Sequence, residues 1–138
     1  MEQPDGTGSG LRRRAFERLL RMHFESGVGH IGGNLSCLDL LLVLHHDVLG
    51  PSDRFVLSKG HCIPIVYAAL AKLGFFPEEQ LGTLRKFGSP LQGHPDRIRC
   101  PGIEAATGSL GQGLSMAVGM AIAGRLDSSD WQIGRAHV

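Results

Sequence analysis

The stretch Asp53-Arg54-Phe55-Val56-Leu57-Ser58-Lys59-Gly60-His61 joins a short apolar run to a glycine–histidine pair. The run at 54–57 is short and is bounded by turn-forming residues, so it predicts a β-strand. Gly60 allows the backbone to turn tightly after the strand and to carry the imidazole of His61 into a cleft. The stretch therefore predicts a strand that ends in a polar loop able to do chemistry.

Helical patterns lie on both sides of this strand. Before it, apolar spacing predicts an amphipathic helix over 11–26 and a second helix over 38–49 that is apolar on most faces. Ser36 and Asp39 match a capping box at the start of the second helix. After the strand, the pattern predicts helices over 63–73, 77–87 and 110–126, with a loop over 88–107. The residue pattern alone thus favours a mostly helical chain.

Length, charge and cysteine content exclude several classes of protein. The chain has 138 residues, enough for one domain or a piece of one. Its 14 Lys+Arg against 13 Asp+Glu give a formal net charge of +1, which favours neither nucleic acid nor an anionic membrane as a partner. No apolar run is long enough to span a membrane, and three cysteines without C-x-x-C spacing indicate a reducing compartment. Residues 1–10 are polar and glycine-rich, and we interpret them as a disordered leader without a secretory signal.

The 20 glycines, about twice the ordinary share, draw attention to the histidines. Three of the seven histidines follow a glycine in segments between predicted elements, namely His30, His61 and His94. An imidazole can donate or accept a hydrogen bond, or move a proton, near neutral pH. For each histidine alone, a loop side chain satisfied by the backbone is the simpler interpretation, but three in the same context favour a polar site built from loops. A zinc site formed by His61, Cys62, His94 and Cys100 matches no standard spacing.

A second glycine-rich feature, Thr107-Gly108-Ser109-Leu110-Gly111-Gln112-Gly113, leads directly into the last predicted helix. Such a turn exposes backbone N–H groups at the positive end of a helix dipole, which suits a phosphate or the polar edge of a heterocycle. The turn lacks the Gly-Lys-Ser/Thr of a Walker A loop, and no clear strand precedes it as in a dinucleotide-binding fingerprint. By itself it is weak support for a cofactor site.

Together these motifs resemble the N-terminal, thiamine diphosphate-binding part of the transketolase family. The resemblance rests on four segments in the family's order and spacing: Gly29–Ser36 (GHIGGNLS), Asp53–His61, Gly93-His94-Pro95 and Thr107–Ser115 (TGSLGQGLS). It covers residues 11–126, and its form resembles the split transketolases, whose N- and C-terminal halves are separate chains. The resemblance implies an α/β fold, a parallel sheet with flanking helices, of which this chain carries mainly the helical N-terminal part.

The resemblance also implies a role for each matched residue. His30 would lie near the reactive carbon of thiamine diphosphate, bind donor hydroxyls and help proton transfer, and His94 would bind the oxygens of the two-carbon fragment. His61 would sit beside the cofactor, whose contacts with the protein backbone would come from Gly108, Ser109 and Leu110. The implied reaction is a cytoplasmic one that moves a two-carbon ketol unit from a ketose phosphate to an aldose phosphate.

Two further features of the family bear on this chain. The family's active site forms with a C-terminal half or subunit in a homo- or hetero-oligomer, and its Mg²⁺ is held on the diphosphate by a Gly-Asp-Gly motif and a later asparagine. Neither motif follows Arg125-Leu126-Asp127, and residues 127–138 show no strand pattern. We therefore expect 127–138 to be a tail that does not match the family, foreign from about Trp131, and the chain to be an incomplete fragment that is inactive alone.

Two other functions remain open at this point. The chain could be a non-catalytic interaction module that associates through the apolar helix at 38–49 and the small-residue face of Gly119 and Gly124. Three polar loop imidazoles argue against it, because association alone does not need them. The chain could also belong to another thiamine diphosphate-dependent ketol or acyl transferase, such as a dihydroxyacetone or deoxyxylulose synthase. The form Ser58-Lys59-Gly60-His61 disfavours deoxyxylulose synthase.

Overall fold

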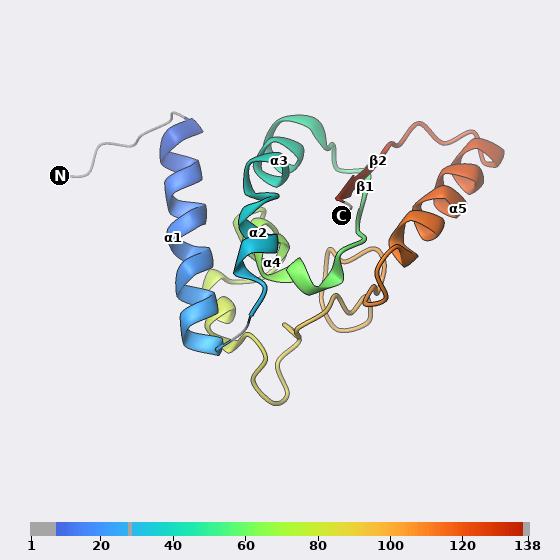
Figure 1. The fold of residues 1–138 in the computed structure, drawn as a ribbon. Helices are drawn as coiled ribbons and strands as arrows, with labels where there is room; N and C mark the ends of the chain where they lie inside the picture. The colour runs from blue at the N-terminus through green and yellow to red at the C-terminus, as the bar shows by residue number, and fades with distance from the viewer. Residues whose placement is uncertain (1–7, 28, 137–138) are drawn as a thin grey trace.

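The computed structural model describes residues 8–27 and 29–136 and arranges them as helices beside a small parallel sheet (Figure 1). The elements in chain order are α1 (Gly8–Ser26), α2 (Ile31–Leu35), α3 (Leu38–Val43), a π-helical turn η1 (Leu44–Val48), β1 (Arg54–Leu57), a 3₁₀ turn η2 (Gly60–Cys62), α4 (Ile63–Lys72), a 3₁₀ helix η3 (Glu78–Thr83), α5 (Gln112–Leu126) and β2 (Ile133–Ala136). In Figure 1, α1 and α5 lie at opposite ends of the molecule, with the sheet between α3 and α5. The predicted parallel sheet with flanking helices is confirmed.

One large apolar core holds α1, α3 and α4 together. α4 packs against both α1 and α3, and it is buried over most of its length because nearly all its residues are apolar. Tyr67 of α4 is fully buried and shares this core with Leu19 of α1 and Leu41 of α3. Pro64 is tolerated in the first turn, where no intrahelical partner for its nitrogen is required. The helix predicted over 63–73 is thereby confirmed.

The sheet consists of two parallel strands. β1 pairs with β2 in a register that runs from Arg54 opposite Ile133 to Leu57 opposite Ala136. Parallel strands need a crossover connection, and here α5 precedes β2 and packs against both strands. β2 falls within 127–138, so the expectation that this segment contains no strand is wrong. The segment lacks an alternating apolar pattern, and the pairing with β1 decides its conformation instead.

Asp53 fixes the start of β2. Its carboxylate accepts hydrogen bonds from the backbone N–H of Gln132 (2.7 Å) and of Gly50 (2.8 Å). These two donors lower the pKa of Asp53, the bond from Gln132 contributing most. The backbone N–H of Arg54 donates in turn to the carbonyl of Gln132 at 2.8 Å. The segment that was expected to be a foreign tail is therefore tied to the beginning of β1.

Trp131 joins the same segment to α5. A Cβ added at Gly124 would lie 2.8 Å from the indole ring, so only a glycine lets the helix approach this closely. The guanidinium carbon of Arg54 lies 5.9 Å from the centre of the indole ring, within the range of a cation–π contact, and the same guanidinium pairs with Glu104 at 3.0 Å. Trp131 is thus an integral part of the packing between α5 and β1.

Other local predictions were corrected by tertiary structure. The helix predicted over 77–87 is only the 3₁₀ helix η3, and the chain reverses at Arg85, which has a left-handed φ of 60°. The predicted capping box does not form, because the Ser36 hydroxyl donates to the carbonyl of Gly33 (2.9 Å) and α3 begins after Cys37. The helix predicted over 38–49 is α-helical only as far as Val43 and then widens into η1.

The first residues also differ from the sequence interpretation. Residues 8–10, taken as part of a disordered leader, are the first turn of α1, while residues 1–7 lie outside the described part of the chain. The short helix α2 was not predicted, because Gly32 and Gly33 favour a turn. None of the helices in the described ranges has the combined length and hydropathy that crossing a bilayer demands.

Candidate functional site

His30 is held in an uncommon backbone conformation at the start of α2. Its φ is 65°, in the left-handed region, and its side chain is exposed. The carbonyl of His30 accepts two hydrogen bonds from Asn34, one from the backbone N–H (3.2 Å) and one from Nδ2 (3.0 Å). The Oδ1 atom of Asn34 accepts from the backbone N–H of Ile65 at 3.1 Å. The fully buried Asn34 side chain therefore anchors the His30 backbone to the first turn of α4.

His61 lies beside His30. The centres of the two rings are 4.8 Å apart and their planes are tilted by 53°. His61 is half-buried, and the pKa of its imidazole is lowered by burial first and then by His30, Lys59 and His94. A positive charge on any of those three neighbours disfavours the imidazolium form of His61. The arrangement therefore favours a neutral His61 ring that can accept a proton or a hydrogen bond near neutral pH.

His94 approaches the same place from the loop between η3 and α5. The buried Tyr67 hydroxyl donates to the carbonyls of Gln92 (3.0 Å) and His94 (3.4 Å), and burial raises the pKa of that hydroxyl. The His94 side chain is exposed, and a Cβ added at Gly108 would lie 3.7 Å from its Cδ2. His94 therefore lies beside Gly108 of the turn before α5 and near enough to His61 to act on its charge.

The turn at 107–113 is fixed on the end of β1. Thr107 is buried, and its hydroxyl donates to the carbonyl of Leu57, the last residue of the strand. A Cβ at Gly60 would lie 2.5 Å from the carbonyl oxygen of Thr107, and one at Gly113 would lie 2.6 Å from the Cα of Ser58. Both distances are shorter than real Cβ contacts, so glycine is required at both positions. The turn and the His61 loop are therefore packed backbone to backbone.

The turn presents its next residues to solvent. The three residues whose backbone was expected to contact a cofactor are all exposed: Gly108, Ser109 and Leu110. Gly111 takes a left-handed φ of 87°, and the 15-residue helix α5 starts directly after it. Free N–H groups at the start of a helix carry partial positive charge and attract anions. The exposed turn thus offers a polar backbone surface next to His94.

The structure gathers the predicted site residues on one surface and leaves the other histidines elsewhere. His30, His61, His94 and the 108–110 turn adjoin one another, whereas His23 is buried in α1 and His45 and His46 lie in η1. His137 lies outside the described residues. Within the described ranges, no three His, Cys, Asp or Glu side chains are placed together to hold a metal ion, so the zinc arrangement does not form there. Cys37, Cys62 and Cys100 are buried free thiols.

Sequence reasoning missed the residues that hold this site in place. Asn34 and Tyr67 bind the histidine backbones, and Lys59, which is 3% exposed, donates from Nζ to the carbonyl of Gly33 (2.7 Å) and to the hydroxyl of Ser36 (3.2 Å). The sequence carried one sign of the role of Lys59. A lysine directly after a buried strand is at a position where burying its charge is costly, so it needs hydrogen-bond partners there. Nothing comparable marks Asn34 or Tyr67, because their partners come from distant segments.

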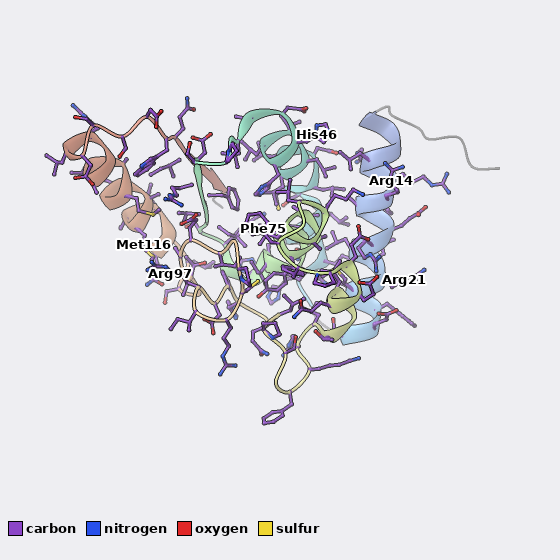
Figure 2. All side chains as sticks on the ribbon, turned by 180° about the vertical axis from the view of Figure 1, so that it is seen from behind. Arg14, Arg21, His46, Phe75, Arg97 and Met116 are labelled. Carbon is purple, nitrogen blue, oxygen red and sulfur yellow. The ribbon has the colours of Figure 1, made fainter. Side chains whose placement is uncertain are left out.

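A groove of the described structure lies away from the three histidines. It lies between α1 and α4, has a volume of about 340 Å³, and is lined by apolar residues and by Arg14, Arg18 and Arg21. Figure 2 shows Arg14 and Arg21 on α1, at the opposite side of the molecule from Met116 on α5. His30, His61 and His94 do not line this groove.

Comparison with known proteins identifies what this arrangement is similar to. Residues 20–134 match the family described as "Transketolase, thiamine diphosphate binding domain". One subunit of the apulose-4-phosphate transketolase of Phocaeicola vulgatus is 45% identical over 125 residues, which cover 84% of this chain and 44% of that protein. The 6-deoxy-6-sulfo-D-fructose transketolase subunit SqwG of a Clostridium species is 50% identical over 110 residues, covering 73% of this chain and 40% of that protein.

Solved structures give the same result. Transketolase from Campylobacter jejuni superposes with a TM-score of 0.77 at 30% identity, over 90% of this chain and 22% of that one. Transketolase from Leishmania mexicana superposes with a TM-score of 0.73 at 35% identity, over 79% of this chain and 18% of that one. The chain spans less than half the length of these curated relatives. The family match extends beyond Asp127 and past Trp131.

Proposed function

The chain belongs to the transketolase family, within its thiamine diphosphate binding domain, and from this premise we propose that it serves a transketolase reaction. The reaction is the transfer of a two-carbon ketol unit from a ketose phosphate to an aldose phosphate. The observation that carries the proposal is that His30, His61 and His94 adjoin one another beside the exposed turn at 108–110. Three segments far apart in the sequence are folded to deliver these groups to one surface.

The residues fit thiamine diphosphate as a cofactor. Gly60 and Gly113 leave no room for a Cβ, so the backbone of the 107–113 turn is held rigidly while Gly108, Ser109 and Leu110 stay exposed. These three residues would hold the cofactor through their backbone, and His61 would lie beside it. When bound, thiamine diphosphate supplies the carbanion chemistry that amino-acid side chains cannot provide.

The protein's own groups then bind and orient the sugar. His30 binds hydroxyls of the donor and moves a proton at its imidazole, and His94 binds the oxygens of the two-carbon unit. Exposure of both rings supports this assignment, because a substrate approaching from solvent meets them first. The neutral form of His61, favoured by burial and by its neighbours, provides an acceptor between them.

The proposed site also includes Mg²⁺ and a partner subunit. Mg²⁺ on the diphosphate would need carboxylate and carbonyl ligands, and the described residues contain no cluster of His, Cys, Asp or Glu that fits a metal. Both curated relatives are named as subunits of transketolases, which supports a hetero-oligomer with a separate C-terminal partner. The buried free thiols at Cys37, Cys62 and Cys100 support a cytoplasmic location.

Reconstitution tests the proposal. The chain is mixed with a C-terminal transketolase subunit, thiamine diphosphate and Mg²⁺, and the sugar phosphates are followed by mass spectrometry. We expect a ketose phosphate to lose two carbons and an aldose phosphate to gain them, and we expect no transfer by the chain alone. A complex that assembles but gives no transfer with any tested pair of sugar phosphates would support the interaction module instead.

A further inference from the structure

We propose that Lys59 is a positioning residue for the histidine pair, because its ammonium ties α2, which follows His30, to the turn that carries His61. The proposal rests on the proposed function in one respect only, namely that the two histidines act on cofactor and substrate. The hydrogen bonds from Lys59 to Gly33 and Ser36 are contacts within this chain.

The side chain of Lys59 is buried. Lys59 is 3% exposed, although a lysine normally keeps its ammonium in water. Its Nζ donates to the carbonyl of Gly33 at 2.7 Å and to the hydroxyl of Ser36 at 3.2 Å, and both acceptors are neutral oxygens. A buried charge is costly, and an apolar side chain of similar length would fill the same space at lower cost. The charge and the donors of Lys59 therefore have a use other than packing.

Lys59 connects α2 to the turn that carries His61. Gly33 lies inside α2, and a Cβ there would be 2.7 Å from the Sγ of Cys62 and 3.7 Å from the Nε2 of His61. α2 is thus seated directly on the His61 turn, and the ammonium of Lys59 fastens the two together from the buried side. A five-residue helix has little stability of its own, so its placement depends on contacts of this kind.

His30 and His61 lie close to the two segments that Lys59 connects. His30 immediately precedes α2, and His61 lies just beyond Lys59 and Gly60. Their ring centres are 4.8 Å apart. A shift of α2 relative to the turn changes this separation directly, and a displacement of about 1 Å at reacting groups can lower a rate about a hundredfold.

Lys59 also acts on His61 by charge. The groups that face the His61 imidazole are His30 from the start of α2, Lys59 from its own turn and His94 from the loop before α5. Burial lowers the pKa of His61 most, and the positive charge of Lys59 lowers it further. Removal of that charge is therefore expected to move the pKa of His61 upward.

The test compares Lys59→Met, Lys59→Arg and, as a matched control, Lys86→Met, in which the exchanged lysine is exposed. In histidine-labelled full chain, NMR records the pH titration of His61 and the ring-to-ring NOE between His30 and His61. We expect Lys59→Met to raise the pKa of His61 and to weaken the NOE, Lys59→Arg to retain most of both, and Lys86→Met to change neither. A folded Lys59→Met chain with both signals as in the wild type would overturn the proposal.

The variant Ser36→Ala and the rate of ketol transfer provide two further tests of the role of Lys59. If Lys59→Met does not fold, Ser36→Ala removes one acceptor of Nζ alone, and an unchanged NOE in that variant counts against the proposal. In the reconstituted enzyme we expect Lys59→Met to lower kcat/KM about tenfold to a hundredfold and Lys59→Arg to recover part of the loss. Full transfer by Lys59→Met refutes the role of Lys59. If the NMR signals change as expected but the wild-type complex transfers no ketol unit, only the proposed function is refuted.

Discussion

The two ends of the molecule are built differently. α1, α3 and α4 enclose a large core that includes Leu19, Leu41 and Tyr67, whereas α5 and β1 share a small cluster formed by Val56, Ala105 and Ala117. α5 buries only small residues against the sheet, and large apolar side chains recur on its exposed side at every fourth position: Leu114, Val118, Ile122 and Leu126. The helical end therefore carries its own core, and the α5 end depends on close backbone contacts.

The candidate site lies at the junction of these two ends. His30 and His61 belong to the well-packed helical end, while the 108–110 turn lies just before the start of α5. The junction itself is formed by Gly60 against Thr107 and by Gly113 against Ser58. The well-packed helical end thus holds His30 and His61 in place, and the two glycine contacts align the 108–110 turn with them.

The largest expected effect comes from the helical core. Leu41→Ala removes a side chain that is 1% exposed, so we expect the free energy of unfolding to fall by about 2–5 kcal/mol. The matched exchange Leu114→Ala removes a side chain that is 41% exposed on α5, and a loss of less than about 1 kcal/mol is expected. Urea denaturation of both variants measures the contrast. Equal losses would mean that the two ends are not packed differently.

The next largest effect is expected on the stability of the contact between Gly60 and Thr107. Gly60→Ala places a Cβ 2.5 Å from the Thr107 carbonyl oxygen, so the two segments must separate, at a cost of about 1–3 kcal/mol. Gly119→Ala is the matched control, because no atom lies within 4 Å of its added Cβ and alanine favours a helix by about 1 kcal/mol. Thermal unfolding is expected to shift down for the first and up for the second. A neutral Gly60→Ala would show that the junction is loose.

The attachment of β2 through Asp53 is expected to depend on pH. The folded-state pKa of Asp53 is lowered from its ordinary value of 3.8 by the N–H groups of Gln132 and Gly50. Its stabilising contribution is therefore present above pH 3.8 and is lost as the pH falls through the lower folded value. Amide hydrogen exchange in 132–136 is expected to accelerate over that range in the wild type. The same acceleration in Asp53→Asn would assign it to another group.

The smallest effect is expected on the outer side of α5. Ile122 is 55% exposed, and Ile122→Gln should change the free energy of unfolding by no more than about 0.5 kcal/mol. Urea denaturation at low protein concentration tests this. A loss as large as that of Leu41→Ala would show that the apolar side of α5 is covered in solution.

Several features were predicted from the sequence because their signals are local. The apolar run before Ser58 identified β1, and glycine–histidine pairs identified the three imidazoles. β2 and the role of Trp131 were missed, because Ile133-Gly134-Arg135-Ala136 has no strand pattern and gains its conformation from β1 and Asp53. Asn34 and Tyr67 were missed for the same reason, since their hydrogen bonds join residues distant in sequence.

The rate of ketol transfer by single histidine variants in the reconstituted complex tests directly whether His30 and His94 act in the reaction. We expect His30→Ala and His94→Ala to lower kcat/KM at least about a hundredfold, as the loss of proton-transfer or binding groups does in comparable sites. His46→Ala, which removes an exposed imidazole of η1 paired with Asp47, should transfer at the wild-type rate. Wild-type transfer by both His30→Ala and His94→Ala would contradict the assignment of the site.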